Sequence, residues 1–326
     1  MNVVYASNDN FARHLGTSLY SLLDRNQLMD EIHVYVLSVN MSNMCKEQLG
    51  QIAERFDRTL DIIELGELEA RFQYRINTGG FDVSTLSRLF VSEVLPESVE
   101  RILYLDCDTV VLRSLEKLWN LDLRGKILAA VMEPTIYESV KAEIGLGSQD
   151  PYFNAGVLLI DLKKWREQDI QSRILEFYEA HGGSLFACDQ DTINGSLKGQ
   201  IRPMSPSYNF FTNYRYFKYE ELVRQSPSYA VVPKEIFRHA KRHPAIVHYM
   251  GDERPWIAGN LNHYRKAYEL YLDLTPWSRT PKESSKRLYM LAYHVMDYLT
   301  FLCPASRRYI SRKFGMSVRN HKTNKS

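Results

Sequence analysis

The sequence contains few cysteines and no long apolar run. Its four cysteines, Cys45, Cys107, Cys188 and Cys303, are widely scattered and form no Cys-x-x-Cys pair. This spacing argues against a zinc knuckle or a disulfide framework and favours reduced thiols. No stretch reaches the ~20 consecutive apolar residues of a membrane-spanning helix, and the first residues do not form a signal peptide. We therefore expect a cytoplasmic protein.

Several catalytic motifs are absent as well. The sequence has no Gly-x-x-x-x-Gly-Lys-Ser/Thr loop, which argues against a P-loop nucleotidase, and no Gly-x-Gly-x-x-Gly after a strand, which argues against a dinucleotide oxidoreductase. It also lacks His-Glu-x-x-His and the Gly-x-Ser-x-Gly elbow of hydrolases. With these motifs absent, the remaining possibility is that the protein binds a diphosphate through a metal ion and not through a glycine-rich loop.

Charge is distributed unevenly along the chain. The 41 Lys and Arg residues and 39 Asp and Glu residues leave a net charge of +2, which gives no reason to expect a nucleic-acid partner. From Lys286 to Ser326, however, nine basic residues face a single acid, Asp297. This tail carries +8 and the preceding 285 residues carry −6, so a mildly acidic body precedes a strongly basic end.

Short apolar runs alternate with amphipathic patterns over most of the chain. Phe11, Leu15, Leu19 and Leu22, for example, recur at the three- and four-residue spacing of one helix face. The predicted strands are 3–6, 32–37, 60–65, 102–105, 127–132, 156–160 and 245–249, and the predicted helices are 10–25, 43–56, 84–95 and 261–272. This alternation predicts an open α/β sheet with right-handed crossovers.

Polar residues follow several of these strands, at the edge of an open sheet where ligands bind. Residues 7–10 follow the first strand, 106–108 follow the fourth, and Gly251 and Arg254 follow the strand at 245–249. Gly251 permits close approach of a ligand and Arg254 can pair with phosphate. The alternative for residues 251–255 is a surface turn.

The segment Asp106-Cys107-Asp108 is the strongest candidate for a metal site. A second Asp-x-Asp occurs at 189–191, so the motif alone means little, but only the first directly follows a buried apolar strand. In extended backbone residues i and i+2 point the same way, so both carboxylates can reach one cation that bridges to a diphosphate. The alternative is a pair of solvated turn carboxylates.

A third ligand is needed, and His248 is the candidate because it follows the apolar run 245–247. Two carboxylates and an imidazole suit Mn²⁺, with Mg²⁺ as the second choice. The alternative is a structural histidine at a strand end.

Five segments in this order resemble the family 8 retaining glycosyltransferases, which include glycogenin and the bacterial lipooligosaccharide α-galactosyltransferases. The likeness is nearest to the bacterial branch and covers roughly residues 1–272. The segments that carry it are Val3-Val4-Tyr5-Ala6-Ser7-Asn8-Asp9-Asn10-Phe11, 101–108 with Asp106-Cys107-Asp108, Tyr152-Phe153-Asn154-Ala155-Gly156, Asp189-Gln190-Asp191 and 248–256.

The resemblance implies a GT-A fold, a Mn²⁺ ion and a UDP-sugar donor, usually UDP-galactose or UDP-glucose. It further implies that uracil and ribose lie near residues 6–11 with Phe11 stacked on the base, that the donor sugar lies near residues 154–155 and 189–190, and that residues 251 and 254 contact the diphosphate. The residues implied to bind donor or metal are Ala6, Ser7, Asn8, Asn10, Phe11, Arg88, Asp106, Cys107, Asp108, Asn154, Ala155, Asp189, Gln190, His248, Gly251 and Arg254.

This chain departs from the nearest members at three of these positions. Asn8 stands where an acid is common, Phe11 where tyrosine is common, and Arg254 where lysine is common. Asparagine can still accept from the uracil N3–H through its amide oxygen, phenylalanine still stacks, and arginine still binds phosphate. Base discrimination is therefore the property that the departures leave open.

According to the resemblance, Gln190 stands where a double displacement would need a carboxylate nucleophile, and glutamine is a poor nucleophile. We therefore expect retention by same-face substitution, with Gln190 stabilising the oxocarbenium-like transition state and Asp189 orienting the sugar. The alternative for Gln190 is a structural role at the start of a helix. Glu133 is expected near the donor sugar, and the aromatic segment 208–219 is expected to form the acceptor pocket.

These expectations describe a hexosyltransferase acting on a bacterial cell-surface polysaccharide, lipopolysaccharide or glycoprotein glycan. Two other classes remain. A metal-dependent nucleotide-sugar phosphohydrolase or nucleotidyltransferase could use the same aspartates, reacting at phosphorus. A catalytically silent glycan- or nucleotide-binding partner is disfavoured because every metal and phosphate position is filled.

The tail predicts a further association. We expect a catalytic domain at 1–281 and a basic, aromatic-rich helical segment at 282–326, in which Leu288, Leu291, Val295 and Leu299 recur at helical spacing. Such segments lie on anionic membranes, each basic residue contributing about 1 kcal/mol. The expected location is the inner face of the cell membrane, where a lipid-linked acceptor can be met. The alternative is a last helix packed on the body, with a solvated basic end.

Overall fold

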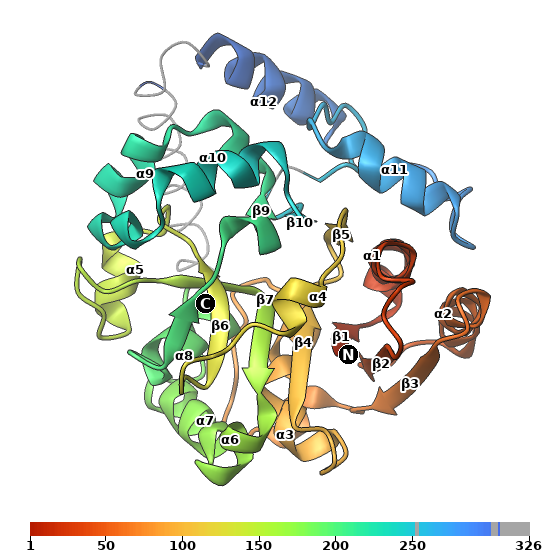
Figure 1. Cartoon of the computed structure of the whole chain (residues 1–326), viewed down its shortest axis with the longest axis horizontal. Coiled ribbons are helices and arrows are strands. Elements are labelled where there is room, and N and C mark those ends of the chain that lie inside the picture. The colour runs from red at the N-terminus through yellow and green to blue at the C-terminus, as the bar shows by residue number, and fades with distance from the viewer. Residues whose placement is uncertain (252–253, 301–305, 307–326) are drawn as a thin grey trace.

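A mixed seven-stranded sheet forms the centre of the computed structural model, which describes residues 1–251, 254–300 and 306 (Figure 1). The strand order is β3-β2-β1-β4-β7-β6-β8. The first four of these are mutually parallel, whereas β7 runs antiparallel to both of its neighbours. The strands are β1 Asn2–Ser7, β2 His33–Ser38, β3 Thr59–Glu64, β4 Arg101–Leu105, β6 Leu128–Met132, β7 Phe153–Asp161 and β8 Ile201–Pro203.

The apolar runs of the sequence become strands that are covered on both faces. Every residue of β6 is buried, as are the last four of β4, and α1 packs beside β1 while α6 packs beside β4 and β7. All seven predicted strands are confirmed. However, β7 begins at Phe153 instead of residue 156, because the polar Asn154 is buried within the strand with its amide hydrogen-bonded.

The helices follow the predicted order with two differences. The α-helices are α1 Asp9–Arg25, α2 Asn43–Arg55, α3 Val91–Val94, α4 Glu116–Trp119, α5 Glu138–Glu143, α6 Leu162–Glu167, α7 Ile170–Ala180, α8 Asp189–Ser196, α9 Tyr219–Gln225, α10 Lys234–Arg242, α11 Arg265–Asp273 and α12 Arg287–Thr300. The 3₁₀ helices are η1 Leu68–Arg71, η2 Val83–Phe90, η3 Pro206–Tyr208, η4 Thr212–Tyr216 and η5 Pro227–Val231.

The prediction of a single helix at 84–95 was wrong, because the 3₁₀ helix η2 and the short α-helix α3 occupy this segment. Hydroxyl side chains compete there with regular helical hydrogen bonds: the Thr85 hydroxyl donates to the Asp82 carbonyl. The helix predicted at 261–272 begins only at Arg265. Asparagine side chains explain this delay, because Asn260 and Asn262 each accept from a backbone N–H two residues on and so form turns.

A second, three-stranded sheet brings a late part of the chain back to the main sheet. It consists of β5 Thr109–Val111, β10 Ile246–His248 and β9 Phe210–Phe211, in the order β5-β10-β9. β10 pairs antiparallel with β5, so that His248 lies opposite Thr109, the residue that follows Asp108. The predicted aromatic loop at 208–219 contains β9 and η4 and packs beside this sheet.

The C-terminal helices α11 and α12 run along the top of the molecule as viewed in Figure 1, at the opposite end from α6 and α7. The connection between them is fixed to the body, because Glu283 forms backbone hydrogen bonds with Trp256 and Ala258. Helix α12 buries Met290 completely but leaves the side chains of Leu288, Val295 and Leu299 mostly exposed. Within the described part of the chain, no helix is long and apolar enough to cross a membrane. The predicted basic end, residues 307–326, lies outside the described residues.

Candidate functional site

Asp106, Asp108 and His248 come together as three potential metal ligands. One ligand atom from each lies within 4.8 Å of the others. The His248 Nε2 atom is 3.0 Å from Asp108 Oδ1 and 3.8 Å from Asp106 Oδ2. Two local features produce this arrangement: the two aspartates follow the buried strand β4, and pairing of β10 with β5 carries His248 to the same edge.

The side chains of this cluster shift one another's pKa values. Burial alone would lower the pKa of His248, but the carboxylates of Asp108 and Asp106 outweigh it and raise that pKa. Burial likewise opposes ionisation of Asp108, yet the neighbouring His248 ring lowers the pKa of Asp108 to about 2. The negative charge is thus retained at neutral pH.

The residues present fit a divalent ion. Two carboxylate oxygens and one imidazole nitrogen make a mixed donor set of the kind that Mn²⁺ accepts. A glycine in β7 gives this set its room: a Cβ atom at Gly156 would lie 2.4 Å from His248 Cε1 and 2.7 Å from Asp106 Oδ2. Any side chain at position 156 would therefore displace two of the three ligands.

Cys107, between the two aspartates, faces the other way. Its thiol donates to the carbonyl of Ala6 at the end of β1, and burial raises the pKa of that thiol. The predicted donor-binding residues Ala6, Ser7 and Cys107 are thus all buried and packed together. The thiol of Cys107 is directed to β1 and is not part of the three-residue cluster.

Arg88 is buried and joins the metal cluster to the second Asp-x-Asp segment. Its guanidinium bonds to Asp106 Oδ1 at 2.7 Å and lies 3.1 Å from Asp189 Oδ2. It also donates to the carbonyls of Thr85 and Ala155. Burial raises the pKa of Asp189 to about 6 even though Arg88 counteracts this. Most of the hydrogen-bonding capacity of Arg88 is therefore used within the protein.

Gln190 occupies the first turn of α8 with its amide held at both ends. The side-chain oxygen accepts from the backbone N–H of Ala155 at 3.0 Å. The side-chain nitrogen donates to Glu133 at 3.2 Å and to the hydroxyl of Tyr152 at 3.0 Å. Ala155 directly precedes Gly156, so Gln190 and the metal cluster contact adjacent residues of β7.

The backbone before Gln190 is held in an unusual conformation. Cys188, the residue at which α8 begins, has a φ of 49° and a ψ of −115°. A non-glycine residue in this region is strained and is found chiefly at functional sites, where surrounding structure holds it. Here the Cys188 side chain is fully buried beside Tyr178, and the strain directs Asp189 and Gln190 toward the cluster.

The structure brings in polar residues that the sequence did not single out. Asp191 accepts from the Tyr152 hydroxyl at 2.5 Å and from the Ala187 N–H at 2.6 Å. The amide of Asn209 lies between Asn154 and His248. Asn209 is an isolated asparagine in an aromatic segment, and nothing in its sequence context marks it.

The predicted nucleotide-binding residues cluster at the start of α1. Phe11 is half-buried with its ring against His14, and Asn10 is exposed. The side chain of Asn8 caps the helix: its oxygen accepts from the Phe11 N–H, and its nitrogen donates to both oxygens of Asp82 at 2.8 and 2.9 Å. The amide oxygen expected to read the base thus already holds one hydrogen bond.

Gly251 and Arg254 lie on either side of residues 252–253, which are outside the described part. Gly251 is exposed with a φ of 69°, a left-handed conformation that favours glycine. Among the described residues the buried Nε of Arg254 has no hydrogen-bond partner. Arg254 also helps to lower the pKa of Asp108. An anion beside the metal cluster would satisfy this guanidinium.

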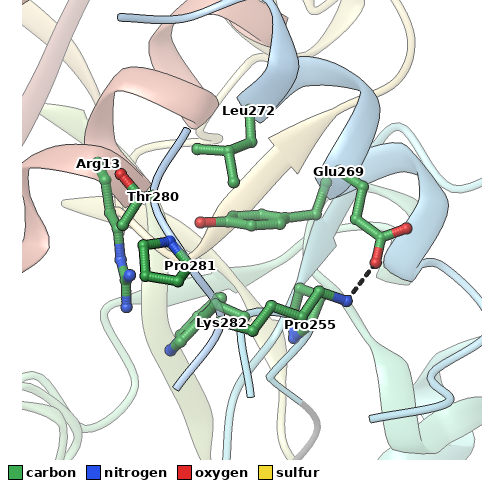
Figure 2. A pocket seen from close by; sticks show the side chains of 9 residues that line it. Arg13, Pro255, Glu269, Leu272, Thr280, Pro281 and Lys282 are labelled. Carbon is green, nitrogen blue, oxygen red and sulfur yellow. Dashed lines mark hydrogen bonds and ion pairs between the residues drawn. The ribbon is translucent and has the colours of Figure 1, made fainter. Parts of the chain in front are cut away.

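A small cavity of about 20 Å³ has none of the three potential metal ligands in its lining (Figure 2). It is lined by Arg13 of α1, by Pro255 and Trp256, and by residues of α11 and the following loop, where Lys282 pairs with Glu269 at 2.5 Å. A volume of this size holds one water molecule. It is too small to be the donor site.

Comparison with known proteins places the chain in a family. The model of glycosyl transferase family 8 matches residues 2–259. General stress protein A of Bacillus subtilis is 29% identical over 281 residues, covering 85% of this chain and 95% of that protein. The lipopolysaccharide 1,2-glucosyltransferase of Escherichia coli K12 is 22% identical over 337 residues, covering 95% of this chain and 91% of its own.

A solved structure shares the fold. The crystal structure of the galactosyltransferase LgtC in complex with donor and acceptor sugar analogs aligns with a TM-score of 0.72 and 26% identity, over 85% of this chain and 96% of that one. The predicted α/β architecture of GT-A type is thus confirmed, as is the predicted resemblance. The chain belongs to glycosyltransferase family 8.

Proposed function

We propose that this protein transfers a hexose from UDP-galactose or UDP-glucose to a glycan acceptor, with retention at the anomeric carbon and with Mn²⁺ bound by Asp106, Asp108 and His248. One observation carries the proposal: the metal cluster and Gln190 meet at the adjacent residues Ala155 and Gly156. A diphosphate held at the cluster would thus present its sugar to Gln190.

The bound cation would neutralise charge on the departing diphosphate. The protein's own groups do the rest. Arg254 lies near Asp108, its Nε has no hydrogen-bond partner within the described part of the chain, and it supplies a second positive charge. Asp189, held by Arg88, positions a sugar hydroxyl. The amide of Gln190 stabilises positive charge at the anomeric carbon while the acceptor hydroxyl attacks from the face that UDP leaves.

The proposed acceptor is a bacterial cell-surface glycan, and two similarities support this. One relative is named a lipopolysaccharide glucosyltransferase, and the aligned LgtC structure holds a donor and an acceptor sugar analog. The aromatic segment at 208–219 lies beside His248 because β9 pairs with β10. Its rings Phe210, Phe211 and Tyr214 are buried, whereas Tyr216 and Phe217 are half-buried and give rings on which a sugar can stack.

Incubation with each UDP-sugar and Mn²⁺ tests this function. We expect UDP and free hexose without acceptor, and an α-linked product by mass spectrometry and NMR when candidate glycans are added. EDTA should abolish both reactions. Release of UMP with a hexose 1-phosphate would instead identify a phosphohydrolase or nucleotidyltransferase acting at phosphorus. No turnover at any Mn²⁺ concentration would identify a silent binding partner.

We further propose that α12 and the basic tail hold the enzyme on the cytoplasmic face of an anionic membrane. The exposed fraction is 82% for Leu288, 59% for Val295 and 70% for Leu299, residues that form one stripe along the helix. Nine basic residues between 286 and 326 complement anionic lipid. A lipid-linked acceptor would then be met on the membrane surface.

Sedimentation with vesicles containing anionic phospholipid tests the association. A truncated chain that ends at Pro281 should stay in the supernatant. The full chain should sediment with the vesicles at low salt and be released by high salt. Because that truncation also removes the buried Met290, a variant with serine at Leu288, Val295 and Leu299 is the sharper probe. Sedimentation of this variant equal to that of the full chain would contradict the proposal.

A further inference from the structure

A chain of buried hydrogen bonds connects the metal ligand His248 to Gln190. From His248 Nδ1 it passes to Asn209 Oδ1 at 2.9 Å, and from Asn209 Nδ2 to Asn154 Oδ1 at 2.8 Å. Asn154 Nδ2 then donates to Glu133 Oε2 at 3.0 Å, which also accepts from Gln190. The exposed fraction of His248 and of the three linking residues does not exceed 7%, and Gln190 is half-buried.

The direction of every bond in this chain follows from two backbone N–H groups. Gly156 N–H donates to Asn154 Oδ1 at 2.9 Å, so that atom is an acceptor. The group of Asn209 that faces it must therefore be the amide nitrogen, and the group that faces His248 must be the oxygen. His248 Nδ1 consequently carries its proton, and Nε2 is left to face Asp106 and Asp108.

The other end is fixed in the same way. Ala155 N–H donates to Gln190 Oε1, so the nitrogen of that amide must be the group that turns to Glu133. Adjacent backbone groups of β7 thus set both the orientation of the His248 ring and that of the Gln190 amide. Asn209 is the only link between His248 and this part of the chain among the hydrogen bonds of the described residues.

We propose that Asn209 is a positioning residue that orients His248 with Nε2 toward the metal ion and, through Asn154 and Glu133, couples this ligand to Gln190. The proposal rests on the metal-dependent transfer proposed above. Outer-shell partners of a ligating histidine fix its tautomer, and their loss weakens metal binding about ten- to hundredfold. The proposal adds a second consequence, since loss of the Asn154 contact should disturb Gln190 even when metal is saturating.

Two variants separate these roles. Asn209→Leu removes both contacts, whereas Asn209→Asp keeps an acceptor for His248 but turns an oxygen toward Asn154 Oδ1. Mn²⁺ binding is titrated by electron paramagnetic resonance with UDP present, and turnover is measured separately at saturating Mn²⁺. Asn26→Leu is the matched control, because Asn26 is equally buried and also bonds through both amide atoms, to Leu22 and Leu115, far from the cluster.

We expect Asn209→Leu to bind Mn²⁺ at least about tenfold more weakly, while Asn26→Leu binds it like the parent protein. Asn209→Asp should keep Mn²⁺ affinity within about threefold and lose about tenfold in kcat. Unchanged affinity in Asn209→Leu would overturn the proposal. If that variant does not fold, Asn209→Asp decides alone: an unchanged kcat, or a tenfold loss of affinity, overturns it.

Failure of the proposed function gives a different result. A parent protein that binds Mn²⁺ with UDP but transfers no sugar would contradict the hexosyltransferase activity, and the affinities of the Asn209 variants would still test the orientation of His248. A parent protein that binds no Mn²⁺ would overturn the positioning role itself.

Discussion

The two Asp-x-Asp segments of this chain share one sequence pattern but arrange their side chains differently. Asp106 and Asp108 point to one cation site together with His248. Asp189 and Asp191 diverge: the first lies beside Arg88, and the second accepts from Tyr152 and from a backbone N–H. The difference is one of backbone, since the first segment follows a strand and the second opens α8.

Backbone geometry explains both outcomes. Asp106 and Asp108 lie in the short turn between β4 and β5, which brings both carboxylates near His248, whereas side chains two residues apart in a helix are about 200° apart around its axis. The helical segment therefore cannot offer two carboxylates to one ion. It instead places Gln190 between an aspartate bound to Arg88 and an aspartate bound to Tyr152. A motif of two carboxylates acquires its chemistry from the element that carries it.

The largest effect on activity is expected at the Asp106 and Asp108 pair. Asp108→Asn replaces the charged carboxylate that faces His248 by a neutral amide, so kcat/KM should fall by at least about 10³-fold with weaker Mn²⁺ binding. Steady-state kinetics across a Mn²⁺ series measures this. Asp122→Asn, in an exposed turn, is the control and should be silent. Full activity of Asp108→Asn would remove Asp108 from the metal site.

The second-largest effect is expected on stability, when Arg88, which joins the two segments, is replaced. Arg88→Lys keeps a positive charge but cannot reach Asp106, Asp189 and two carbonyls together. We expect the free energy of unfolding to fall by about 3 kcal/mol, because buried carboxylates lose their partner. Urea denaturation gives the value. Arg101→Lys, which replaces a guanidinium bonded only to carbonyls of Trp119 and Leu121, should cost less.

The helical segment should respond in turnover rather than in binding. Gln190→Ala is expected to lower kcat about 10²-fold, as for loss of one group that stabilises transition-state charge, while UDP affinity is kept. Calorimetry with UDP and Mn²⁺ supplies the second measurement. A loss of UDP affinity equal to the loss of kcat would show that Gln190 acts in binding and not at the anomeric carbon.

The smallest effect concerns pH. Burial raises the pKa of Asp191 to about 6, despite hydrogen bonds from Tyr152 and Ala187. Because the folded-state pKa exceeds the unfolded value of 3.8, this group costs stability above pH 6, and the cost disappears as pH falls toward 4. Asp191→Asn should flatten that slope, by about 1–2 kcal/mol between pH 4 and 7. Equal slopes in both proteins would contradict the shift.

Much of the fold could be read from the sequence because its strands are buried on both faces and appear as apolar runs. The ligand-binding edge of the sheet could be predicted from where the strands end, and the three potential metal ligands do meet there. Prediction from the sequence failed for residues whose roles depend on contacts with residues distant in the sequence. Arg88 lies in the 3₁₀ helix η2, and no local sequence pattern indicates that its partners are Asp106 and Asp189.

Amide orientation was beyond the sequence for the same reason. Which atom of Asn8, Asn154 or Asn209 faces a neighbour depends on backbone groups placed by other strands. Glu133 was expected beside the donor sugar on the strength of the resemblance, and the structure places it against Gln190 and Asn154. The sequence could name the carboxylate but not the two amides that bind it.

The pairing of β10 with β5 has a consequence for how the protein is made. Asp108 and His248 are 140 positions apart, so an emerging chain holds both aspartates long before it holds the histidine. A nascent chain that has not yet reached His248 cannot assemble the three-ligand set, so an ion that needs all three ligands would not guide the early steps of folding. Once β10 has docked, such an ion would join two distant parts of the chain and stabilise the folded protein. Synthesis and metal loading are therefore ordered in time by topology alone.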